Sequence, residues 1–416
     1  MYMVNRGSSI RRAISLSILN QGLSSAANFI FGLYLVRTLV PVEFGIYGIG
    51  FAISLFVAGI GNSIFLTQMV VNYGDRIVNE RREYLCRMFA GLLTACVLVS
   101  LVTCLTLIVA VNLFEFNESN ITLCLGTLIA SVGFLLKDFF VRQAYTEQNE
   151  GNALLVNIAV AFSILVLCFW QHLTSPAVNA AYALSIYGIS NLIGSILGLA
   201  RARFKTASLV FSKIKADVNE AWFGGGGWYL LVTIANAIQT QAHTIVGAVL
   251  LGPLGVATMN AARLLLTPPL VLLPALNQVF LPRMVERKKL EGDNISTTGL
   301  QITFLLVGLT LLYIAILFPM MDWLFEFVIK SDYKDLNIST YGWFVAVLFI
   351  AVRSGFALEN HAKKEFKKFF YATLVAGFAS VVASWIFIFY LGAVGGPLGL
   401  ALGEFVLVFI IIKYKT

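Results

Sequence analysis

The stretch Leu98–Val111 reads Leu-Val-Ser-Leu-Val-Thr-Cys-Leu-Thr-Leu-Ile-Val-Ala-Val and contains no charged residue. A helix needs about 20 mainly apolar residues to cross the roughly 30 Å hydrocarbon layer of a membrane. The strands of a membrane barrel alternate apolar and polar residues, and this stretch does not alternate. We therefore expect a membrane-spanning helix here, and similar apolar runs recur along the chain.

The whole chain has the composition of an integral membrane protein. Of its 416 residues, 59% are hydrophobic and only 12% are charged, and the mean hydropathy is +0.85. Soluble domains carry about twice this charged fraction. The composition excludes a globular cytoplasmic enzyme, a secreted disulfide-rich module and a disordered chain, and it suffices for roughly twelve spans.

Breaks at polar or Gly/Pro clusters predict an all-α polytopic membrane protein with about twelve transmembrane helices. We expect these helices near residues 14–37, 44–70, 88–112, 120–142, 152–171, 178–200, 226–250, 254–281, 298–318, 340–358, 368–391 and 397–413. Polar residues in the first apolar stretch favour a retained helix over a cleaved leader.

The basic residues predict how the chain is oriented in the membrane. With both termini in the cytoplasm, 23 of the 29 Lys and Arg residues fall on the cytoplasmic side, and three, Arg37, Lys330 and Lys334, fall on the outer side. This bias satisfies the positive-inside rule. Because the basic residues form short clusters between apolar runs, the net charge of +8 does not indicate a nucleic-acid partner.

The longest predicted cytoplasmic loop, residues 201–221, lies near the centre of the chain. We expect an N-terminal lobe of residues 1–200 with helices one to six, and a C-terminal lobe of residues 222–416 with helices seven to twelve. Gly224–Gly227 follow the loop. Such a run suits a flexible junction between two lobes, and it equally suits a loose helix start or close packing.

A faint repeat supports the two lobes, because the first helix of each carries a polar stripe along one face. We take the stripe residues as candidate substrate-binding groups. They are Asn20, Ser24 and Asn28 in helix one, and Asn236, Gln239 and His243 in helix seven. His243 either titrates near neutral pH or serves as a hydrogen-bonded packing residue.

Ionisable residues inside predicted spans are costly there and usually face an interior cavity. They are Lys137, Asp138, Arg142, Arg263, Arg353 and Glu404. The cations outnumber the anions, so the interior path should attract an anion, and guanidinium groups suit phosphate. We take the four cations as candidate substrate-binding residues and the two acids as candidate ion-coupling residues.

Structural roles compete with these assignments. The inner-end group Lys137, Asp138 and Arg142 either contacts substrate or pairs internally at the interface. Arg353 has Glu404 or Glu359 as a structural partner, in which case Glu404 is a counter-charge.

Helix eight should bend next to Arg263. Pro268, Pro269 and Pro274 each remove a helical hydrogen bond and kink the chain. The bend is either part of a gate or static. Arg263 itself has no acidic neighbour in the sequence, which favours a functional role.

Catalytic and cofactor motifs are absent from the sequence. It contains no Gly-x-Ser-x-Gly, no His-Glu-x-x-His and no P-loop. The five cysteines include no Cys-x-x-Cys, and the three histidines are far apart in the sequence. We therefore expect neither an enzyme nor a bound metal or cofactor, and any energy must come from a gradient or a partner.

Two short stretches point to a family. Tyr34–Tyr47 reads Tyr-Leu-Val-Arg-Thr-Leu-Val-Pro-Val-Glu-Phe-Gly-Ile-Tyr, and Pro274–Arg283 reads Pro-Ala-Leu-Asn-Gln-Val-Phe-Leu-Pro-Arg. They resemble the junction of helices one and two, and the end of helix eight, in bacterial polysaccharide transporters. These are the O-antigen flippases of the multidrug/oligosaccharidyl-lipid/polysaccharide exporter superfamily.

The resemblance implies two six-helix lobes around a central cavity that opens to one side of the membrane at a time. It implies transport of an undecaprenyl-diphosphate-linked oligosaccharide across the bacterial inner membrane, in the biosynthesis of O-antigen and lipopolysaccharide. The implied partners are this substrate and membrane lipids, with a proton or sodium ion, a polysaccharide polymerase and a chain-length regulator as further candidates.

Two alternative functions stay open. A multidrug/cation antiporter of the same superfamily would typically carry acidic groups within its first lobe, and helices one, two, three, five and six show no mid-span Asp or Glu. A membrane polysaccharide polymerase would need large outer loops, whereas the longest predicted one, around Asp322–Asn337, is short.

Overall fold

The computed structural model describes residues 2–77, 80–114, 120–174, 178–202, 204, 209–273, 276, 280, 284, 296–327, 329, 333, 335–363 and 366–413. Within these residues the chain is helical and contains no strand. The helices are α1 (Tyr2–Thr38), α2 (Pro41–Gly61), α3 (Thr67–Tyr73), α4 (Arg81–Phe114), α5 (Asn120–Thr146), α6 (Glu150–Thr174), α7 (Ala180–Arg201), α8 (Phe211–Ala221), α9 (Gly227–Leu265), α11 (Ser296–Leu317), α12 (Met321–Phe327), α13 (Leu336–Lys363), α14 (Phe366–Leu391) and α15 (Gly395–Lys413).

The prediction of an all-α polytopic membrane protein with about twelve spans is confirmed. Eight continuous helical stretches in the described part of the chain are long and apolar enough to cross a membrane. Two of them contain a pair of spans each, separated by Gly252 (φ 67°) and Gly392 (φ 65°), in the left-handed region that favours glycine. α1 and α4, of 37 and 34 residues, are further long helices.

Two features differ from the predicted helices. α8 lies inside residues 201–221, which were expected to form a loop. The sequence did not predict this helix because its mixture of polar and apolar residues does not resemble a membrane span. The second predicted helix continues from α2 into α3 through a π-helical turn at Asn62–Leu66. A second π-helical turn, Trp222–Gly226, joins α8 to α9.

The chain divides into two compact units by its internal contacts. Unit 1 contains Met1–Phe31 and Gly50–Ile234, and unit 2 contains Gly32–Ile49 and Ala235–Thr416. α1, α2 and α9 each contribute residues to both units. The lobe boundaries expected from the sequence stay a prediction.

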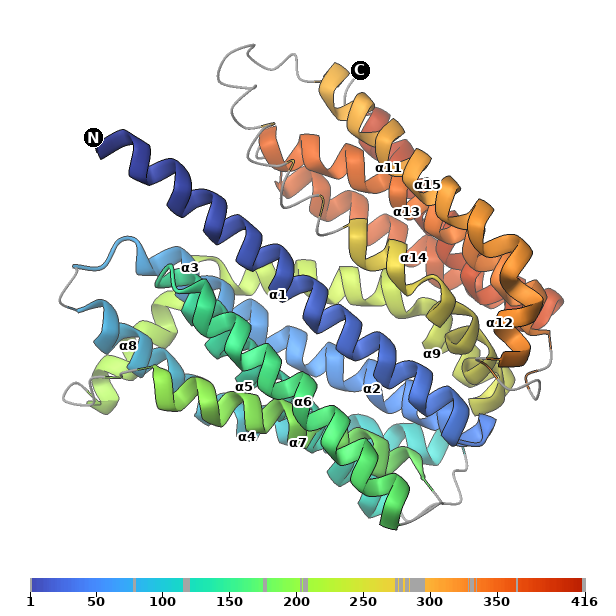
Figure 1. Ribbon diagram of the computed structural model, residues 1–416, viewed down its shortest axis with the longest axis horizontal. Helices are drawn as coiled ribbons and strands as arrows, with labels where there is room; N and C mark the ends of the chain where they lie inside the picture. Colours follow the sequence, from blue (N-terminus) through green and yellow to red (C-terminus); the bar gives the residue numbers. More distant parts are fainter. Residues whose placement is uncertain are drawn as a thin grey trace. The chain divides into compact units, whose positions relative to one another are not determined.

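Unit 1 is built around the close pairing of α5 and α7, which run side by side (Figure 1). A Cβ atom on Gly126 would lie 2.6 Å from the carbonyl oxygen of Ala181, and one on Gly188 would lie 2.5 Å from the backbone of Ala130. Small residues let membrane helices approach this closely, so larger side chains here would force the two helices apart.

Unit 2 contains the stretch Tyr34–Tyr47 and packs it with the same use of small residues. Gly45 lies against the backbone of Pro253, and Gly48 lies against the side chain of Asn260. Leu35 and Val36 in this stretch are buried. The family-like stretch is therefore a packing junction with the second half of α9. The second family-like stretch, Pro274–Arg283, lies mostly outside the described residues.

The predicted bend near Arg263 is confirmed for Pro268 and Pro269, while Pro274 lies outside the described residues. α9 ends at Leu265, and residues 267–273 form a further helical segment. Pro269 has no N–H to donate to the carbonyl of Leu265, four residues earlier. The hydroxyl of Tyr313 in α11 donates to that carbonyl instead, at 2.6 Å.

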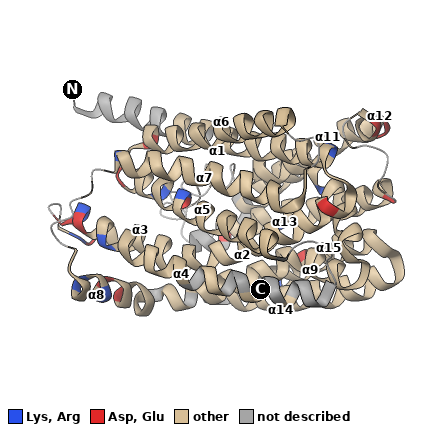
Figure 2. Ribbon diagram, turned by 90° about the horizontal axis from the view of Figure 1, so that it is seen from below, with Lys and Arg blue, Asp and Glu red and all other residues tan. Residues whose placement is uncertain are grey.

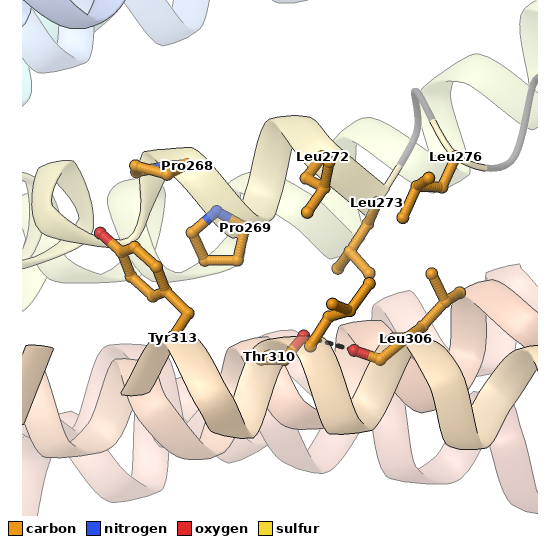
Figure 3. A pocket seen from close by; sticks show the side chains of 9 residues that line it. Pro268, Pro269, Leu272, Leu273, Leu276, Leu306, Thr310 and Tyr313 are labelled. Carbon is orange, nitrogen blue, oxygen red and sulfur yellow. Dashed lines mark hydrogen bonds between the residues drawn. The ribbon is translucent and has the colours of Figure 1, made fainter. Parts of the chain in front are cut away.

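A small apolar pocket of about 240 Å³ lies beside this bend (Figure 3). From the bent segment it is lined by Pro268, Pro269, Leu272, Leu273 and Leu276, and from α11 by Leu306, Leu309, Thr310 and Tyr313. The pocket therefore lies between the bent segment and α11.

Candidate functional site

Arg263 is a membrane-embedded cation that stays accessible. Arg263 lies 11 residues after the kink at Gly252, which corresponds to about 16 Å along the helix. This length is about half the thickness of the roughly 30 Å hydrocarbon layer. Its guanidinium carbon lies 5.5 Å from the centroid of the Trp343 ring. Arg263 is partly exposed, and among the described residues it forms no ion pair. No acid in the described part of the chain therefore neutralises its charge.

His243 packs on the same tryptophan. The two rings meet edge to face with centroids 5.0 Å apart, and His243 is completely buried. Both ring nitrogens lack a hydrogen-bond partner. Because burial disfavours an uncompensated charge, this histidine serves as a neutral packing group in the conformation described.

Arg353 and Glu404 form an ion pair within unit 2. Their Nε and Oε2 atoms are 2.5 Å apart, although the N–H is not aligned for a hydrogen bond. The sequence left Glu404 and Glu359 as possible partners of Arg353, and the structure pairs it with Glu404. The Glu404 side chain is buried, with 1% exposed.

Unit 1 holds a second intramembrane group of charges. The Nζ of Lys137 donates to Asp138 Oδ1 at 2.8 Å, and the Nδ2 of Asn62 donates to Asp138 Oδ2 at 3.3 Å. Lys137 also lies 4.6 Å from the centroid of the Phe134 ring. Arg142 contributes its positive charge near Asp138 without a direct ion pair in the described residues. The internal pairing considered from the sequence is therefore present for Lys137 and Asp138.

The polar stripes divide into buried and accessible members. Asn20 donates to the Tyr145 hydroxyl at 2.6 Å and accepts from Asn157 at 2.8 Å, so it links α1 to α5 and α6. Gln239 and His243 are also buried. By contrast, Ser24 is half-buried, and Asn28 and Asn236 are exposed.

Three contributors escaped the sequence analysis. Asn62 and Asn157 are amides inside spans, which is a signal in the sequence, but neither lies on the polar stripe of helix one or helix seven. Trp343 gave no signal, since aromatic residues make up 13% of the chain.

Among the described residues, the two intramembrane acids are paired with cations, whereas two of the four intramembrane cations are not. Asp138 and Glu404 each pair with a cation, while Arg142 and Arg263 form no ion pair in the described part of the chain. In the same part of the chain, no three His, Cys, Asp or Glu side chains lie close enough to hold a metal ion.

Comparison with known families identifies the chain. The family described as "Polysaccharide biosynthesis protein" matches residues 10–288, which is more than half of the 416 residues. The chain belongs to this family. The match covers most of α1, all of α2 to α9, and the bend with Pro268 and Pro269. No curated protein sequence matches the chain.

Solved structures match this family member over nearly its whole length. A lipid II flippase, MurJ, in an inward closed conformation is 15% identical, with a TM-score of 0.73 over 97% of this chain and 88% of that one. An inward-facing multidrug resistance MATE family transporter of the MOP superfamily is also 15% identical, with a TM-score of 0.70 over 94% and 93%. These likenesses show the fold of the exporter superfamily, as the resemblance implied.

Proposed function

We propose that the protein is a flippase that moves an undecaprenyl-diphosphate-linked oligosaccharide repeat unit across the bacterial inner membrane by alternating access. The repeat unit belongs to O-antigen or a related surface polysaccharide. In this proposal both termini lie in the cytoplasm, and two lobes expose the substrate path to one side of the membrane at a time.

The accessible Arg263 carries the proposal. A diphosphate headgroup needs cationic hydrogen-bond donors within the bilayer, and a guanidinium forms bidentate hydrogen bonds with phosphate oxygens. Arg142 and the exposed amides Asn28 and Asn236 supply further charge and polar groups for phosphates and sugar hydroxyls. The lipid tail can stay in the hydrocarbon layer.

The family description supports the polysaccharide part of the proposal. Coupling to a proton or sodium gradient through Glu404 or Asp138 belongs to the same proposal, as does work beside a polysaccharide polymerase and a chain-length regulator. In a coupling cycle, each acid would exchange its pairing cation, Arg353 or Lys137, for the transported ion.

The likeness to the MATE transporter favours a multidrug/cation antiporter as the second candidate. The pairing of both acids opposes it, since an organic cation would find no free carboxylate at either residue.

Deletion of the gene in its bacterial host separates the two functions. We expect loss of surface polysaccharide, accumulation of undecaprenyl-linked single repeat units on the cytoplasmic leaflet, and unchanged drug tolerance. Unchanged polysaccharide with altered drug tolerance would replace the flippase by the antiporter. Accumulation on the outer leaflet would indicate the polymerase.

A further inference from the structure

α8 exposes an apolar surface that the rest of unit 1 does not cover. Phe211 is 76% exposed and Trp222, just after the helix, is 42% exposed. At intervals of four and seven residues, Phe211, Lys215 and Trp222 share one face of the helical path. Phe223 is 82% exposed. Aromatic and lysine side chains on one face are typical of a helix that lies in a membrane interface.

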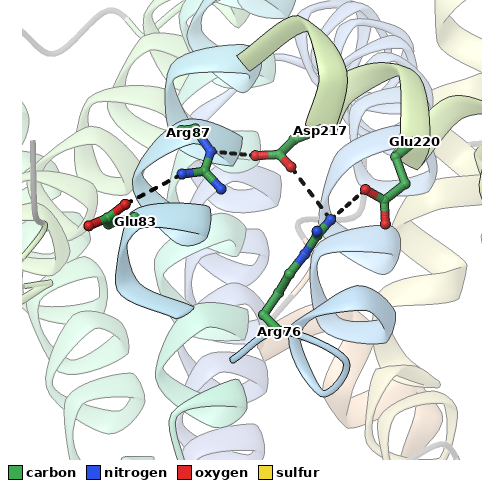
Figure 4. A network of polar contacts seen from close by, with 5 residues as sticks. All are labelled: Arg76, Glu83, Arg87, Asp217 and Glu220. Atoms are coloured by element: carbon green, nitrogen blue, oxygen red, sulfur yellow. Dashed lines mark hydrogen bonds and ion pairs between the residues drawn. The ribbon is translucent and has the colours of Figure 1, made fainter. Parts of the chain in front are cut away.

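α8 is fixed to the body of unit 1 along the side that carries the buried Asp217 and Ala221. Val218 packs at Gly91 in α4, where an added Cβ would lie 2.7 Å from it. Asp217 is buried and accepts a hydrogen bond from Arg87 Nε at 2.5 Å (Figure 4). α8 is therefore held along α4, while the side chains of Phe211 and Trp222 stay exposed.

The acids of α8 are neutralised by arginines outside it. Arg76 pairs with Asp217 at 3.5 Å and with Glu220 at 2.5 Å. Burial lowers the pKa of Arg76, but its hydrogen bond to Glu220 and the charges of both acids outweigh this effect and raise the pKa above its ordinary value. The exposed Lys213 and Lys215 thus remain as uncompensated positive charge on α8. Figure 2 shows charged residues gathered around α8 and α3.

The chain itself places α8 at the membrane boundary. The membrane-length stretch Tyr229–Leu265 begins eight residues after α8 ends at Ala221. A helical path of this length covers about 12 Å at 1.5 Å per residue. The end of α8 at Ala221, together with Trp222 and Phe223, therefore lies close to the boundary of this span.

We propose that α8 docks on the anionic lipid headgroups of the leaflet that it faces, with Lys213 and Lys215 on the phosphates and Phe211, Trp222 and Phe223 in the interface. Charge complementarity and the tie to the adjacent span select this occupant. Each lysine near an anionic membrane surface contributes about 1 kcal/mol. Because α8 leads through Trp222–Gly226 into α9, lipid binding fixes the start of that span.

Hydrogen exchange of the full-length protein in nanodiscs tests this docking. The amides of residues 211–221 are followed in discs of phosphatidylcholine alone and in discs that also contain phosphatidylglycerol. Since binding stabilises the ordered helix, we expect exchange in the wild type to be about tenfold slower with phosphatidylglycerol. In K213Q/K215Q the two lipid compositions should give equal rates.

The matched control R201Q/K413Q removes the same charge from exposed positions outside α8, and it should keep the wild-type difference. Equal rates in both lipids for the wild type would overturn the proposal. So would a difference that K213Q/K215Q retains, or one that the control loses to the same extent. All these readouts are independent of transport, so they leave the proposed flippase function untouched.

Discussion

The guanidinium carbon of Arg263 lies over the ring of Trp343, 5.5 Å from its centroid. The indole N–H of Trp343 donates to the carbonyl of Met259 at 2.9 Å, one helical turn before Arg263. α9 therefore holds the tryptophan through a hydrogen bond and carries the arginine over its face. Cation–π attraction of this kind contributes about 0.5–2 kcal/mol, which fixes the guanidinium in place without neutralising it.

Two substitutions of Trp343 distinguish the role of its ring from the role of its hydrogen bond to Met259. Trp343→Phe keeps an aromatic face and loses the donor to Met259, so we expect transport within about threefold of the wild type and a modest fall in melting temperature. Trp343→Leu removes the face and should reduce transport as strongly as loss of Arg263. The checks are thermal unfolding in detergent and a transport assay. Wild-type transport in Trp343→Leu would remove this tryptophan from the site.

Arg263 should be essential for transport and dispensable for membrane insertion. We expect Arg263→Ala to lower the transport rate at least about tenfold, since a charge-assisted hydrogen bond is lost, while Arg263→Lys retains part of it. Arg37→Ala is the matched control, because Arg37 lies 5.8 Å from the Phe327 ring in the same type of contact but is exposed near the end of α1. Normal transport by Arg263→Ala would make Arg263 a structural residue.

Tyr313 should stabilise the bend by replacing a hydrogen bond that proline removes. Tyr313→Phe leaves the carbonyl of Leu265 without a donor, and we expect it to destabilise the protein by about 1–3 kcal/mol. Pro269→Ala restores an N–H at the position that faces this carbonyl. The double variant should therefore lose less stability than the sum of the single variants. Additive losses in thermal unfolding would show that the hydroxyl has another role.

Variants of Arg353 and Glu404 test whether Glu404 acts only as a counter-charge to the arginine. Glu404→Gln leaves a membrane-embedded arginine without its partner and should destabilise by about 3–5 kcal/mol. The double variant R353Q/E404Q should recover most of this stability. If Glu404 couples transport to an ion, transport stays lost in the double variant. Recovery of both properties would assign the pair to structure alone.

Two acids on α8 share Arg76 and differ in burial. Asp217 is buried, whereas the Glu220 side chain is 50% exposed. Asp217→Ala should destabilise by about 3 kcal/mol, since it leaves the buried Arg87 with only its longer ion pair to Glu83, at 3.8 Å. Glu220→Ala should change stability by less than about 1 kcal/mol. Equal effects in chemical unfolding would contradict the assignment of Asp217 as the anchor of α8.

The apolar runs allowed the twelve spans to be predicted, because burial in lipid dictates their length and composition. The break near Pro268 was predictable for the same local reason, since proline lacks an N–H. α8 was not, because a short helix that packs one face on α4 carries no membrane-length signal. Its stability comes from tertiary partners such as Arg87.

The candidate site was predictable in its residue types and not in its pairings. Arg263 and Glu404 could be selected from the sequence because an ionisable side chain inside a membrane span is energetically costly. Which acid neutralises Arg353 depends on how α13 and α15 pack, and both Glu359 and Glu404 were consistent with the sequence. The burial of Asn20 and His243 likewise depends on neighbouring helices that a single polar stripe does not specify.

Reconstitution of the purified protein in liposomes tests the central claim most directly. The liposomes contain a fluorescent undecaprenyl-diphosphate-linked oligosaccharide, and an enzyme that acts on the exposed sugar reports which leaflet holds it. We predict that wild-type protein makes the inner-leaflet lipid accessible, at least about tenfold faster than Arg263→Ala or empty liposomes. Equal rates for wild-type protein and empty liposomes, with the protein folded, would contradict the flippase function.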